Sequence, residues 1–273
     1  MKKKAVFNMI ILFLLFGHEI QAATNISYKI EMLPWEEINN VLPKYSKFTV
    51  LDIETGMRFK VQRRAGSHHA DVQPLTTKDT NIMKKIYSGK WSWKRRAIVV
   101  INKDQWIAGS MHGMPHGGGA LKNNFPGHFC IHFYGSTTHR TNAMDLSHML
   151  MIFKAAGKLE EYLSMASPYE TVEAYIAAFK QQDAFISSLI SVQKQNWKPI
   201  LKKVENVRIT RMPILPAEDL TQEISIEVPI EIDWFIKDRG RQSYRGKIQL
   251  IRFSTMDAWK IDSDLFLKEN DLK

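Results

Sequence analysis

Cysteine is almost absent from this chain of 273 residues, which contains Cys130 and no other. A single cysteine cannot form an intramolecular disulfide, so a disulfide-stapled fold is excluded. Long apolar runs are missing after residue 22, whereas a membrane-spanning helix needs about 20 consecutive apolar residues. Apart from His18, every histidine lies between His68 and His148. The side chains best suited to catalysis or metal binding are therefore confined to the middle of the chain.

The first 22 residues have the pattern of a secretory signal peptide. Lysines at positions 2 to 4 precede an apolar run over residues 5–16, and small residues follow at Ala22 and Ala23. The apolar run is too short to span a bilayer. We therefore expect residues 1–22 to be removed, the mature chain to have no membrane span, and the protein to be secreted or associated with the cell wall.

Positive charge exceeds negative charge, with 38 Lys and Arg against 28 Asp and Glu. Removal of residues 1–22 takes away three lysines and Glu19, which lowers the formal charge from +10 to +8. A basic exported protein is attracted to polyanions, which outside the cell are acidic cell-wall polymers rather than nucleic acid. A basic surface that only keeps the protein soluble explains the same charge.

Hydrophobic periodicity in the first part of the chain predicts mostly strands. We expect a hairpin over residues 48–61, a loop over 63–74, a helix over 77–87, strands over 91–101 and 106–111, and a helix over 145–156. Trp91 and Trp93 alternate in the first of those last two strands, which favours a place in the core. The pattern predicts a mostly-β catalytic domain over residues 23–165.

The second part of the chain opens with a helix-capping pattern at Ser167, Pro168 and Glu170. Residues 224–234 then alternate apolar and polar side chains as a long strand, with partners at 244–253 and 258–261. Pro229 indicates an edge or a bulge in that strand. We expect an accessory domain over residues 166–273, and its helix followed by an antiparallel sheet resembles cystatin-like or nuclear-transport-factor-like domains. The fold class predicted for the whole chain is α+β.

Residues 111–133 are the most site-like stretch. They combine Cys130 with His112, His116, His128 and His132 and with glycines at 113, 117 to 119 and 127. Glycine permits close approach of a ligand to the backbone, and a thiol among imidazoles is typical of a thiolate nucleophile or a metal site. A buried small hydrophobe is the alternative for a lone cysteine. We expect an accessible thiol with a lowered pKa.

This stretch resembles a divergent form of the signature of L,D-transpeptidases, the cysteine enzymes that cross-link peptidoglycan. In that family a strand ends in His-Gly, and a Ser/Thr-His-Gly-Cys run follows after an interval. His112 and Gly113 match the first part, and His128 and Cys130 match the second. The chain departs from the pattern at Gly127, Phe129 and His132, where the family has a hydroxyl residue, a glycine and an arginine.

The resemblance implies acyl transfer on peptidoglycan peptides without a cofactor. Cys130 would be the nucleophile, His112 the general base, and His128 a residue that orients the base or donates a hydrogen bond. The remaining members of the stretch are expected to contact the substrate: His116, Gly113, Gly127 and His132.

Two other interpretations use the same residues. His68, His69 and Asp71, together with His128 and His132, have the composition of a catalytic zinc site with an open position. A zinc-dependent cell-wall peptidase is therefore the second hypothesis. A module that binds cell-wall sugar or peptide without catalysis is the third.

Overall fold

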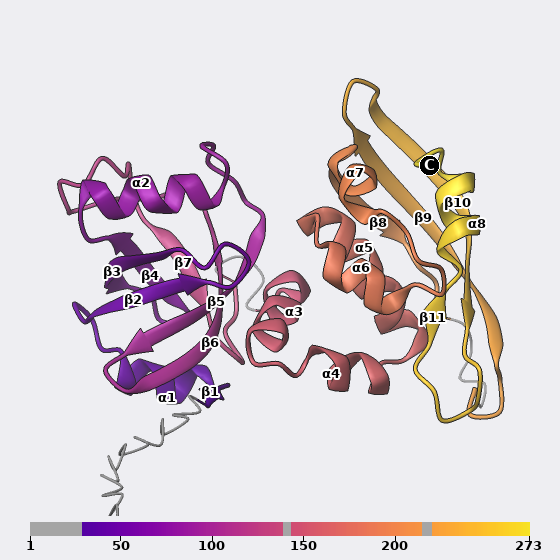
Figure 1. The fold of residues 1–273 in the computed structure, drawn as a ribbon, viewed down its shortest axis with the longest axis horizontal. Helices are drawn as coiled ribbons and strands as arrows, with labels where there is room; N and C mark the ends of the chain where they lie inside the picture. Colours follow the sequence, from indigo (N-terminus) through magenta and orange to yellow (C-terminus); the bar gives the residue numbers. More distant parts are fainter. Residues whose placement is uncertain (1–28, 139–142, 215–219) are drawn as a thin grey trace, which may run out of the picture.

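The computed structural model describes residues 29–138, 143–214 and 220–273, and the predicted signal peptide over residues 1–22 lies outside these ranges. The fold is α+β, as the sequence predicts (Figure 1). Within the described ranges, no helix is both long enough and apolar enough to cross a membrane.

Six antiparallel strands close into a barrel in the N-terminal half (Figure 1). The strands are β2 (Lys47–Asp52), β3 (Arg58–Ala65), β4 (Ala70–Pro74), β5 (Arg95–Asn102), β6 (Gln105–His112) and β7 (Phe129–His132). Their order is β6, β5, β2, β3, β4, β7, and β7 pairs with the end of β6 to close the ring. The short strand β1 (Ile30–Glu31) runs parallel to the start of β6.

The barrel interior is apolar, and two helices contribute to it. Val72, Phe129 and Ile131 belong to the same buried cluster as Ile38 of α1 (Trp35–Val41) and Met83 of α2 (Thr77–Ile86). Successive side chains of a strand point to opposite faces. The residues that alternate with these apolar ones on β4 and β7 therefore point out of the barrel.

The C-terminal half is a curled antiparallel sheet covered by helices. Its strands are β8 (Val204–Arg211), β9 (Ser225–Ile236), β10 (Gly240–Ile251) and β11 (Lys260–Ile261), in the order β11, β10, β9, β8. The helices are α5 (Pro168–Gln181), α6 (Ala184–Ile190), α7 (Trp197–Lys202) and α8 (Ser263–Glu269). Phe179 of α5 packs edge-on against Trp234 of β9, with ring centroids 5.3 Å apart. Such aromatic pairs anchor the helices to the sheet.

Helix α3 (Leu146–Ala155) lies between the two halves, and α4 (Leu159–Met165) continues from it (Figure 1). Ala97 and Ala108 on the outer wall of the barrel share one buried apolar cluster with Leu150 of α3 and with α5. This cluster continues into the second sheet. The division of the chain at residue 165 stays a prediction, and α3 and α4 share the core of the C-terminal half.

The structure corrects two local expectations. Residues 63–74 are not a single loop, because β3 extends to Ala65 and β4 occupies Ala70–Pro74. Strand β5 begins at Arg95, so Trp91 and Trp93 precede it, and Trp93 is 51% exposed rather than in the core.

Pro229 meets the edge expectation only locally. Strand β9 is internal in the sheet, but β8 ends its pairing at Glu231, so Pro229 lies beyond the end of β8. On the β8 side, Pro229 therefore faces no strand that would need a hydrogen bond from its missing N–H.

Candidate active site

Three neighbouring strands place polar side chains on the outer wall of the barrel. Asp71 of β4 lies directly opposite Cys130 of β7, and Ser110 of β6 lies directly opposite His132 of β7. Residues that face each other across an antiparallel pair project from the same side of the sheet. The barrel thus brings a carboxylate, a thiol and an imidazole together from segments far apart in the sequence.

The loop between β6 and β7 folds back so that His116 lies over β7. His116 and His128 exchange two backbone hydrogen bonds, each 2.9 Å long. Gly127 makes this approach possible because its φ is +120° and a Cβ atom there would lie 2.4 Å from the His116 carbonyl oxygen. An L-residue with a side chain at position 127 would push the loop away.

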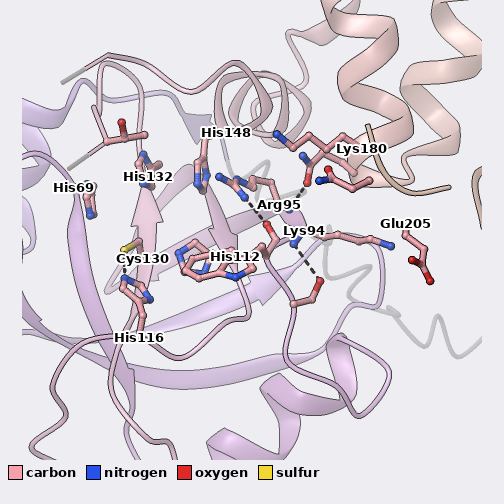
Figure 2. A pocket seen from close by; sticks show the side chains of 15 residues that line it. His69, Lys94, Arg95, His112, His116, Cys130, His132, His148, Lys180 and Glu205 are labelled. Atoms are coloured by element: carbon pink, nitrogen blue, oxygen red, sulfur yellow. Dashed lines mark hydrogen bonds between the residues drawn. The ribbon is translucent and has the colours of Figure 1, made fainter. Parts of the chain in front are cut away.

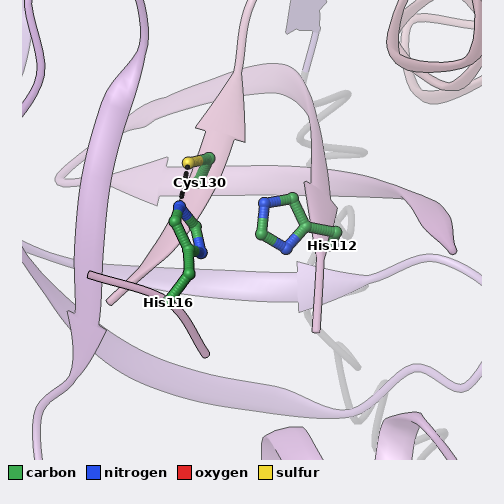
Figure 3. Close-up of side chains that lie close together, drawn as sticks. All are labelled: His112, His116 and Cys130. Atoms are coloured by element: carbon green, nitrogen blue, oxygen red, sulfur yellow. Dashed lines mark hydrogen bonds between the residues drawn. The ribbon is translucent and has the colours of Figure 1, made fainter. Parts of the chain in front are cut away.

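Cys130 is buried, with 3% of its surface exposed. Its Sγ lies 3.3 Å from Nε2 of His116 and 3.6 Å from Oδ1 of Asp71 (Figure 3 shows the contact with His116). Burial, followed by the Asp71 carboxylate, raises the pKa of the Cys130 thiol above its ordinary value. The prediction of an accessible thiol with a lowered pKa is therefore wrong, because a neighbouring carboxylate and desolvation both disfavour the thiolate.

His116 and His112 hold different tautomers. Nδ1 of His116 lies 3.2 Å from the Met114 carbonyl oxygen, which can only accept, so Nδ1 donates and Nε2 offers its lone pair to Cys130. Nδ1 of His112 accepts the backbone N–H of Met114 at 3.3 Å, so the neutral His112 ring carries its proton on Nε2. Burial, followed by the Arg95 guanidinium, lowers the pKa of His112 to about 2 and keeps the ring neutral.

Besides Cys130, Asp71 contacts two histidines. Nε2 of His69 lies 3.3 Å from Asp71 Oδ1, and Nε2 of His128 lies 3.7 Å from the same oxygen. Nδ1 of His69 is 2.8 Å from the Thr137 carbonyl oxygen, and Nδ1 of His128 is 3.1 Å from that of Gly118. Both rings are therefore oriented by backbone carbonyls, with Nε2 turned toward the carboxylate.

His132 is stacked between two other imidazoles. Its ring centroid lies 4.4 Å from that of His69 and 3.8 Å from that of His148. His148 of α3 is buried and places Nδ1 2.8 Å from the Ser110 hydroxyl. The stack covers a face of the His69 ring, whereas the hydrogen bond to Thr137 is made at the edge of the ring.

A pocket of about 910 Å³ opens on this wall (Figure 2). The barrel supplies His69, Trp93, Lys94, Arg95, His112, His116, Cys130 and His132 to its lining. The C-terminal half supplies Lys180 and Gln181 from α5 and Glu205 and Asn206 from β8. The backbone N–H of Arg95 donates to Gln181 Oε1 at 2.6 Å, which joins the two halves at the pocket. The pocket is histidine-rich where it meets the barrel, and its cations, Lys94, Arg95 and Lys180, outnumber its one acidic residue, Glu205.

Most of the residues predicted for the site do converge. Cys130, His112, His116 and His132 line the pocket, and Asp71, His69 and His128 lie beside Cys130 or its partners. Three predicted residues have another place or role. His68 is exposed to solvent, and Gly113 and Gly127 pack closely against neighbouring atoms of the protein.

Gly113 packs against the Tyr87 ring, where an added Cβ atom would lie 2.4 Å from a ring carbon. It is therefore required for packing, as Gly127 is required for the fold-back of the loop. The contributions of Lys180, Gln181, Glu205 and Asn206 were missed, because no sequence pattern connects the C-terminal half to residues 111–133.

Comparisons with protein-family models, with curated proteins and with solved structures find no match to this chain. The barrel by itself does not identify an L,D-transpeptidase-like domain. The resemblances noted for residues 111–133 and for the C-terminal half stay predictions, and the functional argument depends on the geometry of the site.

Proposed function

We propose that this protein is a thiol enzyme that transfers acyl groups of peptides, with Cys130 as nucleophile and His116 as general base. The observation that carries the proposal is the 3.3 Å contact between Cys130 Sγ and His116 Nε2 at the wall of the pocket. A nucleophile, a base in hydrogen-bond reach and a third group that orients the base are the elements of nucleophilic catalysis. The Met114 carbonyl is the orienting group.

The raised pKa of Cys130 sets the order of events. The resting thiol is protonated, and in this mechanism its proton leaves Sγ for the lone pair of His116 Nε2 during attack on the substrate carbonyl. The new S–C bond forms as the amide C–N bond breaks, and His116 returns the proton to the leaving amine. An acceptor amine or water then cleaves the thioester, with His116 accepting and returning its proton in the same way.

His112 has a separate role in this proposal. Because its Nδ1 accepts from Met114 and its pKa is lowered to about 2, the neutral ring presents an N–H at Nε2. His112 and Cys130 have side-chain atoms within 4.8 Å of each other. A fixed neutral donor at this place is suited to stabilising the oxyanion that develops on the attacked carbonyl. Removal of one such donor from an acyl-transfer site costs about 2.7–4 kcal/mol of transition-state stabilisation.

Peptidoglycan peptides are the proposed substrate class, and a secreted or cell-wall location is the proposed setting. The signal-type start of the chain and its positive charge support this setting. Lys94, Arg95 and Lys180 at the pocket favour a substrate that carries carboxylates, as the stem peptides of peptidoglycan do. Acidic cell-wall polymers remain the proposed partner of the basic surface.

The chain from residue 23, incubated with peptidoglycan fragments, tests the proposal by mass spectrometry of the intact protein. We expect an acyl adduct on Cys130, no adduct in Cys130→Ala, and a rate of acylation lowered by about 10²–10⁴-fold in His116→Gln. His68→Gln is the matched control, because His68 is an exposed histidine of the same region. Turnover of the fragments by Cys130→Ala would show that the thiol is not the nucleophile. The absence of any adduct with bound fragments would favour the binding-module hypothesis.

A further inference from the structure

We infer that His69, Asp71 and Cys130 form a binding site for a thiophilic divalent cation of the zinc class. Their ligand atoms all lie within 4.8 Å of one another. An imidazole nitrogen, a carboxylate oxygen and a thiolate sulfur are the ligand types that zinc takes in proteins. The predicted zinc set shares His69 and Asp71 with this site but includes the exposed His68 and omits Cys130.

Two of the three ligand separations match edges of a coordination tetrahedron. With ordinary zinc bond lengths, a tetrahedral site has S···O and N···O edges of about 3.6 and about 3.4 Å. The observed distances are 3.6 Å from Cys130 Sγ to Asp71 Oδ1 and 3.3 Å from His69 Nε2 to Asp71 Oδ1. The third separation, from the His69 ring nitrogen to Cys130 Sγ, is within 4.8 Å, so the three ligands already surround one point.

The surroundings orient each ligand toward that point. Nδ1 of His69 donates to the Thr137 carbonyl at 2.8 Å, which leaves Nε2, facing Asp71, as the ring nitrogen that can bind a cation. Histidines that ligate metals commonly donate their other N–H to a backbone carbonyl in this way. Asp71 and Cys130 are fixed opposite each other by the pairing of β4 with β7. His69, Asp71 and Cys130 are 1%, 7% and 3% exposed. Packing against the barrel wall therefore fixes the positions of the three side chains.

The charge balance also suits a divalent cation. On binding, the S–H bond of Cys130 breaks, the sulfur donates to the cation, and the proton leaves to solvent. The thiolate and the Asp71 carboxylate then neutralise two positive charges. His69 and Cys130 both line the pocket, so the fourth position of the cation opens toward it and is filled by water.

Cation binding has a consequence for activity that rests on the proposed function. A sulfur that donates to a cation is no longer free to attack a carbonyl, so the loaded protein is the inactive form. The site is then a metal-responsive control of the thiol. The binding itself does not depend on the acyl-transfer mechanism.

Cobalt(II) and zinc titrations of the full chain from residue 23, kept reduced, test the site. We expect one Co²⁺ per chain with a thiolate-to-cobalt charge-transfer band, which Zn²⁺ displaces, and release of a proton on binding. Cys130→Ser is expected to lose the band, and His69→Gln and Asp71→Asn to lower the affinity at least about 10-fold. His68→Gln is the matched control and is expected to bind like the wild type.

His116→Gln separates this inference from the proposed function. It removes the proposed base but none of the three ligands, so it is expected to keep the cobalt band while acylation slows. A band that persists in His69→Gln and Asp71→Asn would overturn the ligand assignment. Failure of the wild type to bind either cation would overturn the site, while the acylation assay is read independently.

Discussion

His148 connects the stability of the protein to pH. It is buried behind the site, where desolvation and then the neighbouring His132 lower its pKa well below the ordinary 6.5. In the pH range below about 6.5, the unfolded chain takes up a proton at this histidine and the folded chain does not. The stabilisation is therefore complete above that pH and is lost as pH falls, at up to about 1.4 kcal/mol per pH unit for each such histidine.

Denaturant unfolding between pH 8 and pH 5 measures this dependence. We expect the wild type to lose stability over this range and His148→Asn to lose less, because asparagine does not titrate. The amide of His148→Asn retains a hydrogen-bonding group near the Ser110 hydroxyl that Nδ1 contacts. Parallel pH profiles for the two proteins would contradict the assignment.

Which residues form the site was largely predictable from residue types, but which of them contact one another was not. A thiol among histidines is visible in the sequence, and Cys130 is at the centre of the cluster in the structure. The sequence pattern pointed to His112 as the base, whereas His116 makes the contact, because the loop folds back through its backbone bridge to His128. The effect of Asp71 on the thiol required the register of β4 against β7, which no local pattern contains.

A chain of ion pairs joins the barrel to the C-terminal half through α3. Arg96 of β5 contacts Asp52 at 2.6 Å and Glu54 at 3.1 Å. Lys154 of α3 contacts Glu54 at 3.3 Å and Asp183, the N-cap of α6, at 2.5 Å. Asp183 is 4% exposed, so its charge depends on Lys154 for compensation.

Replacement of Lys154 by methionine tests how strongly this chain holds the halves together. Removing one partner of a buried pair costs about 3–5 kcal/mol, because the other charge stays buried. We expect Lys154→Met to lower the free energy of unfolding toward that amount, and Lys158→Met, on the exposed end of the same segment, to change it by less than about 0.5 kcal/mol. Chemical denaturation of both variants measures the difference. Equal stabilities would show that α3 is held by apolar packing alone.

Elements with local signals were predicted well. The helices that begin after Thr76 and Ser167 have complete capping boxes, and the hairpin of β2 and β3 and the long strand β9 are present as expected. Strand β4 was missed because its partners, β3 and β7, decide its conformation rather than its own short sequence. The closure of the barrel depends on pairings between distant segments, which hydrophobic periodicity does not reveal.

The pocket belongs to the whole molecule rather than to the barrel. Its lining passes from the histidines of the barrel to Lys180 and Glu205 of the C-terminal half, and the Arg95 contact with Gln181 ties the two together (Figure 2). The sequence predicted an accessory domain over the C-terminal half. Its residues in the pocket make it part of the substrate site in the function proposed here.

The closed ring of strands determines when the site forms during folding. Asp71 and Cys130 are 59 residues apart in the chain, yet their strands must pair before the wall that carries the site exists. Contacts between distant segments form slowly, because the entropy of loop closure is lost before the contact stabilises the chain. The helices are therefore expected to appear before Cys130 becomes shielded.

Pulsed thiol labelling during refolding follows this order of events directly. We expect Cys130 to stay reactive through the early rise of helical circular dichroism and to become protected only in the last phase. Protection that accompanies the first helical signal would mean that β4 and β7 pair early. A newly synthesised molecule thus passes through a period in which its one thiol is exposed to oxidants, before the barrel has closed around it.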